Sequence, residues 1–164
     1  MNGKVEVNEM APDFNLPSQS GTSIKLSDFL GKKWIVLYFY PKDDSLGCRA
    51  ESCAFRDSYE VFKEAGAEVI GVSSDGIDSH AQFSSKHRLP FILLSDVGGI
   101  VRKQYGVPTT LGMLPGRVTY VIDKKGMVRH IFSSQFKPRE HVDESLRIIK
   151  EGKANKELLC PKFI

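Results

Sequence analysis

Two cysteines lie five positions apart at the start of an amphipathic segment, and they are the residues best suited to redox chemistry. Cys48 follows the polar loop 41–47, and Cys53 lies within the helical pattern that comes next. At the start of a helix, free N–H groups and the positive end of the dipole stabilise a thiolate, and Arg49 adds a cation. The position favours an activated thiol, although a small buried structural cysteine fits it equally well.

The segments on either side of the loop determine where Cys48 lies. Residues 34–40, WIVLYFY, are apolar without alternation, which is typical of a strand buried on both faces. Pro41 ends that strand. From Arg49 onward, apolar side chains recur at i, i+4 and i+7, which predicts one helix ended by Gly66. Cys48 therefore lies at the start of a helix, directly after a central strand.

The remaining patterns alternate strands with helices. The sequence predicts an entry hairpin in 11–26, a short turn capped by Ser27, strands at 69–72 and 91–94, helices at 77–88 and 100–105, a hairpin of 118–122 with 127–132, and a helix from Pro138. This order indicates an α/β, thioredoxin-like fold: a central mixed β-sheet flanked by helices, with an N-terminal hairpin extension. We expect a single domain over 1–164, with an irregular C-terminal tail at 153–164.

Composition narrows the function classes. The 164 residues carry a formal net charge of only +3 with dispersed basic residues, so we expect no binding to nucleic acid. The longest apolar run is far shorter than the about 20 residues of a membrane helix, so we expect no membrane binding. Three cysteines do not suit a secreted disulfide framework. We expect a reducing intracellular compartment, plastid or cytoplasm, with no targeting segment in this chain.

Several short motifs together resemble the peroxiredoxins, most closely the subgroup called peroxiredoxin Q or bacterioferritin comigratory protein. The motifs are APDF at 11–14, YFYPKDD at 38–44, GC at 47–48, CAFRD at 53–57 and LPGR at 114–117. The resemblance covers residues 5 to 152, and the Pro-x-x-x-Ser/Thr-x-x-Cys spacing is highly specific. It implies an antioxidant oxidoreductase, a thiol-dependent peroxidase that reduces hydrogen peroxide and alkyl hydroperoxides.

The resemblance also assigns roles to individual residues. Cys48 is the peroxidatic thiol and Cys53 the resolving thiol, which form an intramolecular disulfide that thioredoxin or a similar dithiol recycles. The remaining site residues are Ser45 in a hydroxyl position usually held by Thr, Pro41 shielding the pocket, and Arg117 as the cation. No metal or organic cofactor is implied, and we expect a monomer.

The chemistry explains these residue types. A thiolate attacks one peroxide oxygen while the other leaves with negative charge, so the site needs an activated sulfur and hydrogen-bond donors. The N–H groups of the loop, the Ser45 hydroxyl and the Arg117 fork can supply them. Attack leaves a sulfenic acid, which a second thiol condenses to a disulfide before further oxidation.

The sequence departs from the subgroup in two places. Ser45-Leu46 stands where Thr-Pro is usual, which keeps the hydroxyl but loses a rigidifying ring. Near the end of the chain, Leu159-Cys160-Pro161 is similar to the C-terminal resolving cysteine of dimeric peroxiredoxins, so resolution by Cys160 is an alternative.

Other polar residues leave further alternatives. Glu51 matches an acidic position of the subgroup and either orients Arg117 or is an ordinary residue of a helix N-terminus. The four histidines form no ligand spacing and are interpreted as surface residues. Two cysteines do not make a zinc site, which needs four ligands.

Two other function classes remain open. A thioredoxin-like disulfide oxidoreductase normally carries Cys-x-x-Cys, whereas this pair is Cys-x-x-x-x-Cys. A non-enzymatic redox-sensing or chaperone module would keep the fold and one oxidisable cysteine without turnover. Peroxide-dependent oxidation of thioredoxin over many cycles would separate these classes from a peroxidase.

Overall fold

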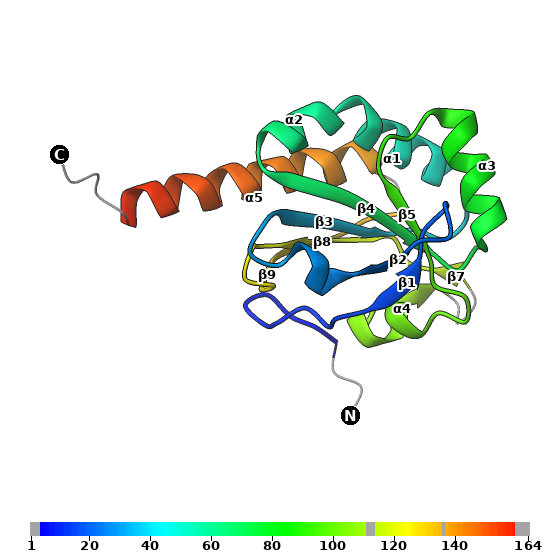
Figure 1. Cartoon of the computed structure of the whole chain (residues 1–164), viewed down its shortest axis with the longest axis horizontal. Helices are drawn as coiled ribbons and strands as arrows, with labels where there is room; N and C mark the ends of the chain where they lie inside the picture. Colours follow the sequence, from blue (N-terminus) through cyan, green and yellow to red (C-terminus); the bar gives the residue numbers. More distant parts are fainter. Residues whose placement is uncertain (1–3, 111–113, 136, 160–164) are drawn as a thin grey trace.

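A five-stranded mixed sheet forms the centre of the molecule, in a computed structural model that describes residues 4–110, 114–135 and 137–159 (Figure 1). Its strand order is β5-β4-β3-β8-β9; β3, β4 and β5 are parallel, while β8 is antiparallel to β3 and β9 to β8. The strands are β1 Asn15–Pro17, β2 Ser23–Lys25, β3 Trp34–Phe39, β4 Ala67–Ser73, β5 Ile92–Ser95, β6 Thr109–Thr110, β7 Leu114–Pro115, β8 Val118–Ile122 and β9 Val128–Ser133. The helices are η1 Leu26–Phe29, α1 Leu46–Asp57, α2 Tyr59–Glu64, α3 Ile77–His87, α4 Ile100–Tyr105 and α5 Pro138–Leu159, of which η1 is a 3-10 turn.

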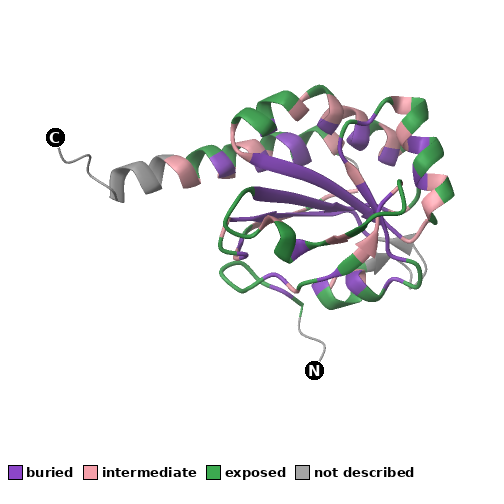
Figure 2. Ribbon diagram, in the orientation of Figure 1, coloured by how far each residue is buried: buried purple, intermediate pink, exposed green. Residues whose placement is uncertain are grey.

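The central strand β3 is buried along its whole length, as its unbroken apolar run predicts, because both faces of the sheet are covered (Figure 2). Alternate residues of β3 face opposite cores. Val36 and Tyr38 pack with side chains of α1, α2, α3 and α5, whereas Ile35 and Leu37 pack with η1, α4 and residues near the entry hairpin. The predicted α/β, thioredoxin-like architecture is confirmed, and Cys48 belongs to the core that includes α1 and α5.

The predicted single helix from Arg49 to Gly66 is wrong in two respects. The helix begins earlier, at Leu46, and it is interrupted at Ser58, which separates α1 from α2. Ser58 leaves the helical conformation, with φ −105° and ψ 4°, while its N–H still bonds back to α1. Because α1 starts at Leu46, Cys48 lies in its first turn.

The capped turn and the C-terminal tail also differ from the sequence prediction. Ser27 does not cap the short turn: η1 begins at Leu26, and Lys25 is its N-cap, with the Lys25 N–H donating to Asp28 Oδ2 at 3.0 Å. The predicted irregular tail is also wrong up to Leu159, because α5 continues as a helix to that residue. Gly152 is not a helix stop; a Cβ there would lie 2.5 Å from the Trp34 ring, so glycine allows α5 to pass closely over β3.

The interpretation of all four histidines as surface residues is wrong. His80 and His141 are completely buried, and His87 and His130 are partly buried.

No described helix is both long and apolar enough to cross a membrane.

Candidate active site

Cys48 lies in the first turn of α1, at the carboxyl end of β3, and its side chain is fully buried. Ser45 is the N-cap, and the first helical hydrogen bond runs from the Arg49 N–H to the Ser45 carbonyl at 2.8 Å. The N–H groups that precede Arg49 are therefore free of helical partners and point out of the helix start. This geometry favours an anion at Cys48, as expected from the sequence.

Arg117 brings its guanidinium to the same place from the residue before β8. Its Nη2 donates to Cys48 Sγ at 3.2 Å, and its Nη1 donates to Glu51 Oε1 at 2.9 Å. The fork is almost completely buried and joins two residues one helical turn apart on α1. Burial alone would lower the pKa of Arg117, but the neighbouring Glu51 and Cys48 raise it, so the guanidinium stays charged.

Glu51 has the environment of a buried acid. Its side chain is fully buried, and the loss of hydration raises its pKa to about 8, although the charge of Arg117 acts in the opposite direction. The sequence left two roles open for Glu51, and the contact with Arg117 Nη1 decides in favour of orienting the guanidinium.

His141 lies behind Glu51 and was missed as a site residue. It comes from the first turns of α5, and its Nδ1 lies 2.7 Å from the Thr119 hydroxyl and 3.4 Å from Glu51 Oε2. Its Nε2 lies 2.9 Å from the Ser134 carbonyl oxygen. Burial lowers the pKa of His141 to about 4. The sequence signal was weak, because His141 lies about 100° around the helix from Val142, at the edge of the apolar stripe.

The other predicted site residues lie in the loop before α1, at its N-cap, on α1 itself or near the end of the chain. The Ser45 hydroxyl donates to the Lys42 carbonyl at 3.0 Å, a bond within the loop. Pro41 is half-buried directly after β3 and Tyr40. Cys53 is a partly exposed free thiol on α1, while Cys160 lies outside the described residues.

Asp43 anchors the loop that leads to Cys48. Its Oδ1 accepts a hydrogen bond from Tyr40 at 2.6 Å, and its Oδ2 lies 2.7 Å from His80 Nδ1 and accepts from Ser79 at 2.8 Å. His80 Nε2 in turn lies 2.9 Å from the Leu94 carbonyl. These contacts attach the loop to α3 and β5.

A cation site at this anchor has little support. Asp43, Asp75 and His80 have ligand atoms within 4.8 Å of one another. Asp75 Oδ2 already accepts hydrogen bonds from the Asp43 N–H and from the Ser73 hydroxyl. The cluster is therefore satisfied by the protein's own hydrogen bonds.

Asp44 holds a second anchor on the exposed side of the loop. It adopts a left-handed conformation, with φ 59°, and pairs with Lys86 at 2.7 Å, His87 at 2.9 Å and Arg49 at 3.2 Å. The bonds from Lys86 and His87 hold the pKa of Asp44 well below its usual range. Arg49 therefore pairs with Asp44, although the sequence suggested that it supports Cys48.

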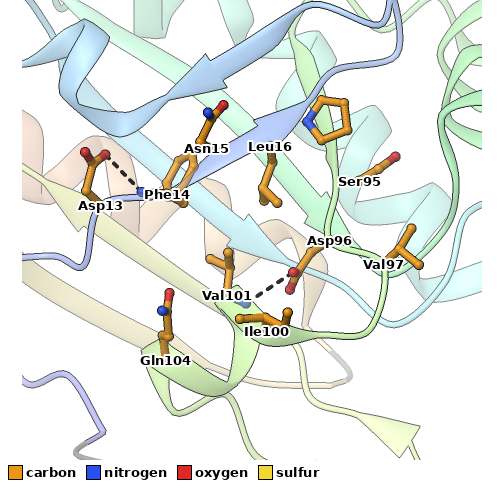
Figure 3. A pocket seen from close by; sticks show the side chains of 11 residues that line it. Asp13, Phe14, Asn15, Leu16, Ser95, Asp96, Val97, Ile100, Val101 and Gln104 are labelled. Atoms are coloured by element: carbon orange, nitrogen blue, oxygen red, sulfur yellow. Dashed lines mark hydrogen bonds between the residues drawn. The ribbon is translucent and has the colours of Figure 1, made fainter.

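A separate hollow of about 450 Å³ lies between β1, the end of β5 and α4 (Figure 3). Phe14 and Val101 at its wall belong to the core on the opposite face of the sheet from Cys48. None of the residues that line it is among the candidate catalytic residues.

Comparison with known proteins places these residues in a wider context. The AhpC/TSA family model matches residues 7–131. The chain is 55% identical over 149 residues to a chloroplastic peroxiredoxin Q of Triticum aestivum, with 90% of this chain and 68% of that protein covered. It is 54% identical over 148 residues to the chloroplastic peroxiredoxin Q of Arabidopsis thaliana, with the same coverage of both chains, 90% and 68%.

Solved structures show the same relationship. The peroxidoxin BcpB of Mycobacterium tuberculosis superposes with a TM-score of 0.83 at 37% identity, covering 88% of this chain and 96% of that chain. A bacterioferritin comigratory protein of Xanthomonas campestris, described for its alkyl peroxide reduction activity, superposes with a TM-score of 0.79 at 30% identity, covering 85% and 91%.

Proposed function

The chain belongs to the AhpC/TSA family and to its peroxiredoxin Q subgroup, and on this basis we propose that Cys48 is the peroxidatic cysteine, Cys53 the resolving cysteine and Arg117 the cation of the site. The enzyme is a thiol-dependent peroxidase. The observation that supports the assignment is the Arg117 fork, whose Nη2 donates to the buried Cys48 sulfur at 3.2 Å. A sulfur that accepts a charged hydrogen bond at a helix start is stabilised as a thiolate.

In the first step, the Cys48 thiolate attacks the distal peroxide oxygen. A sulfur–oxygen bond forms, the oxygen–oxygen bond breaks, and the leaving alkoxide or hydroxide takes a proton to give an alcohol or water. Negative charge spreads from sulfur onto the peroxide oxygens during attack, and Arg117 with the first-turn N–H groups lies where that charge develops. Ser45 contributes its hydroxyl once the peroxide is bound, and Pro41 limits the access of water.

In the second step, the Cys53 thiol attacks the sulfenic acid of Cys48. A disulfide forms and water leaves, which protects Cys48 from irreversible oxidation. Thioredoxin or a similar dithiol then reduces the disulfide and is itself oxidised. Because Cys53 is partly exposed, a dithiol partner has access to this side of α1.

The substrates are hydrogen peroxide and alkyl hydroperoxides. The bacterioferritin comigratory protein of Xanthomonas campestris, described for alkyl peroxide reduction, supports alkyl hydroperoxides as substrates.

Several relatives are chloroplastic, which supports a plastid over a bacterial-type cytoplasm as the location of this protein. We further propose a monomer that binds neither nucleic acid nor membranes, for which sedimentation of the reduced protein with and without these partners is the test.

A coupled assay tests the proposal. Catalytic amounts of the protein should sustain peroxide-dependent oxidation of thioredoxin over many cycles with hydrogen peroxide and an alkyl hydroperoxide. Turnover with a small dithiol but not with thioredoxin would remove thioredoxin as the reductant. Sustained turnover by Cys48→Ser would remove Cys48 as the nucleophile.

The non-enzymatic redox-sensing or chaperone alternative predicts one oxidation event per chain and no cycling. The buried hydrogen bond from Arg117 to Glu51 disfavours it, because a sensor needs an accessible thiol but no cation held at fixed geometry. Resolution by Cys160 is the other alternative, and it is separated from resolution by Cys53 through single serine variants.

A further inference from the structure

Arg117 carries one positive charge but contacts two acidic groups. Its Nη2 faces the sulfur of Cys48, and its Nη1 faces the carboxyl group of Glu51. Both groups are fully buried, where an uncompensated charge is strongly unfavourable. If Cys48 and Glu51 were both anions, one guanidinium would be shared between two negative charges.

The surroundings of the second carboxyl oxygen favour a neutral, protonated Glu51 over an ionised one. Oε1 accepts the hydrogen bond from Arg117, whereas Oε2 is buried without a hydrogen-bond donor among the described residues. The polar atom facing it is His141 Nδ1, 3.4 Å away. A buried carboxylate oxygen with no donor is costly, while a protonated oxygen there would meet an acceptor.

The orientation of the His141 ring makes Nδ1 that acceptor. Nε2 lies 2.9 Å from the Ser134 carbonyl oxygen, which can only accept, so Nε2 carries the hydrogen. Burial keeps the ring neutral by lowering the pKa of His141 to about 4. Nδ1 then presents a lone pair, to which the Thr119 hydroxyl donates at 2.7 Å. Glu51 Oε2 lies 3.4 Å from the same nitrogen, so a protonated Glu51 would share this single lone pair with Thr119 as the second, longer donor.

We propose that Glu51 and His141 hold one proton between Glu51 Oε2 and His141 Nδ1 in the reduced protein, which leaves the positive charge of Arg117 to the Cys48 thiolate. The inference rests on the proposed role of Cys48. His141 is thus a positioning residue: it touches no reacting atom and acts through the protonation of Glu51 and the charge balance of Arg117.

The other groups around Glu51 are consistent with this charge balance. They come from every element that packs against it: Cys48 on α1, Arg117 before β8, His141 on α5 and the Tyr38 hydroxyl on β3. Burial raises the pKa of Tyr38 well above its usual value, so its hydroxyl, bonded to Ser52, is neutral. With Glu51 protonated, the buried cluster sums to zero: one thiolate and one guanidinium.

The protonation of Glu51 beside His141 should also make the rate constant of the reaction with peroxide depend on pH. Loss of the shared proton adds a second negative charge beside Arg117, which then supports less of the charge that develops on the peroxide. The rate constant for peroxide should therefore fall at alkaline pH, by about threefold or more once the proton is lost. Glu51→Gln cannot ionise, so the ratio of its rate constants at neutral and alkaline pH should be close to one.

Infrared spectroscopy of the reduced full-length protein provides a readout that does not depend on activity. At pH 7 we expect the C=O stretch of a protonated carboxyl group, which shifts in D₂O and disappears in Glu51→Gln. Glu68→Gln is the matched control, because Glu68 is also buried but accepts hydrogen bonds from Tyr59 and the Val69 N–H. The band should remain in that variant.

Two variants of opposite effect test the partner. His141→Phe keeps a ring but removes the acceptor, so the band should move to higher frequency. Thr119→Val removes the competing donor at Nδ1, so the band should move to lower frequency. Absence of a Glu51-dependent band at pH 7 would overturn the proposal, as would a band that neither variant moves. A peroxidase without the band refutes only the shared proton, whereas the band in a protein that is inactive toward peroxide refutes only the proposed function.

Discussion

Arg117 occupies the space that a side chain on Gly47 would need. A Cβ atom at position 47 would lie 2.8 Å from Arg117 Nη2, the nitrogen that donates to Cys48. The first-turn residue before the cysteine and the cation 70 positions later in the chain therefore fit together only because residue 47 has no side chain.

Gly47→Ala should displace the guanidinium from Cys48. We expect a lower rate constant for peroxide and a loss of about 1–3 kcal/mol in the free energy of unfolding, because the added methyl group overpacks a buried contact. Stopped-flow peroxide kinetics and denaturant unfolding measure the two effects. Gly76→Ala is the control, since a Cβ there meets nothing within 4 Å. Equal kinetics in both variants would show that the Arg117 position tolerates a shift.

Cys48→Ser should abolish peroxidase activity, because the thiolate nucleophile is lost. Cys53→Ser should instead consume about one peroxide per chain and then stop as the sulfenic acid or a more oxidised form. Mass spectrometry of the treated proteins distinguishes these products. Full turnover by Cys53→Ser would transfer the resolving role to Cys160, and loss of recycling in Cys160→Ser would exclude the intramolecular scheme.

Arg117→Lys should react with peroxide much more slowly than the wild-type protein, even though the positive charge of residue 117 is kept. The guanidinium bonds Cys48 and Glu51 with two nitrogens at once, and an ammonium group cannot reproduce this planar fork. We expect a fall of about 10- to 100-fold in the rate constant for peroxide. Near-normal kinetics would mean that Arg117 acts through its charge alone.

Turnover should require α1 to unwind near its start. Residues 48 to 53 all lie within α1, so five residues give about 140° of net rotation and a rise of about 7.5 Å. The two Cα atoms are then about 8.7 Å apart on a helix of radius about 2.3 Å, whereas a disulfide needs less than about 7 Å. Hydrogen exchange across 47–54 should be faster in the oxidised protein. Equal protection in both states, with the Cys48–Cys53 bond present, would contradict this prediction.

The free energy of unfolding should report the protonation of Glu51. A carboxyl group whose pKa rises from 4.5 to about 8 on folding binds its proton more tightly in the folded state. This contribution is complete below pH 4.5 and is lost as the pH rises toward 8. Relative to Glu51→Gln, the wild-type protein should lose at most about 1.4 kcal/mol per pH unit in that window. Denaturant unfolding at several pH values checks this, and a pH-independent difference would mean that Glu51 is ionised throughout.

Several features of the fold followed from the sequence because they depend on neighbouring residues. The unbroken apolar run of β3, the proline after it and the apolar period of α1 together place Cys48 at a helix start. The order of strands and helices then predicts the mixed sheet. The irregular tail expected from residue 153 was wrong for a reason that depends on distant packing: Gly152 lies against Trp34, and the helix continues past it.

The contacts around Cys48 were decided by the tertiary structure. Motif resemblance selected Arg117, but its contact with Cys48 joins residues 69 positions apart. The residues around His141 in the sequence do not predict its contact with Glu51, because that contact forms only when α5 packs on α1. Local sequence determines backbone conformation through short-range sterics and periodicity, whereas burial and pKa depend on which distant segments exclude water. The candidate nucleophile could therefore be proposed from the chain alone, whereas the distant groups that surround it could not.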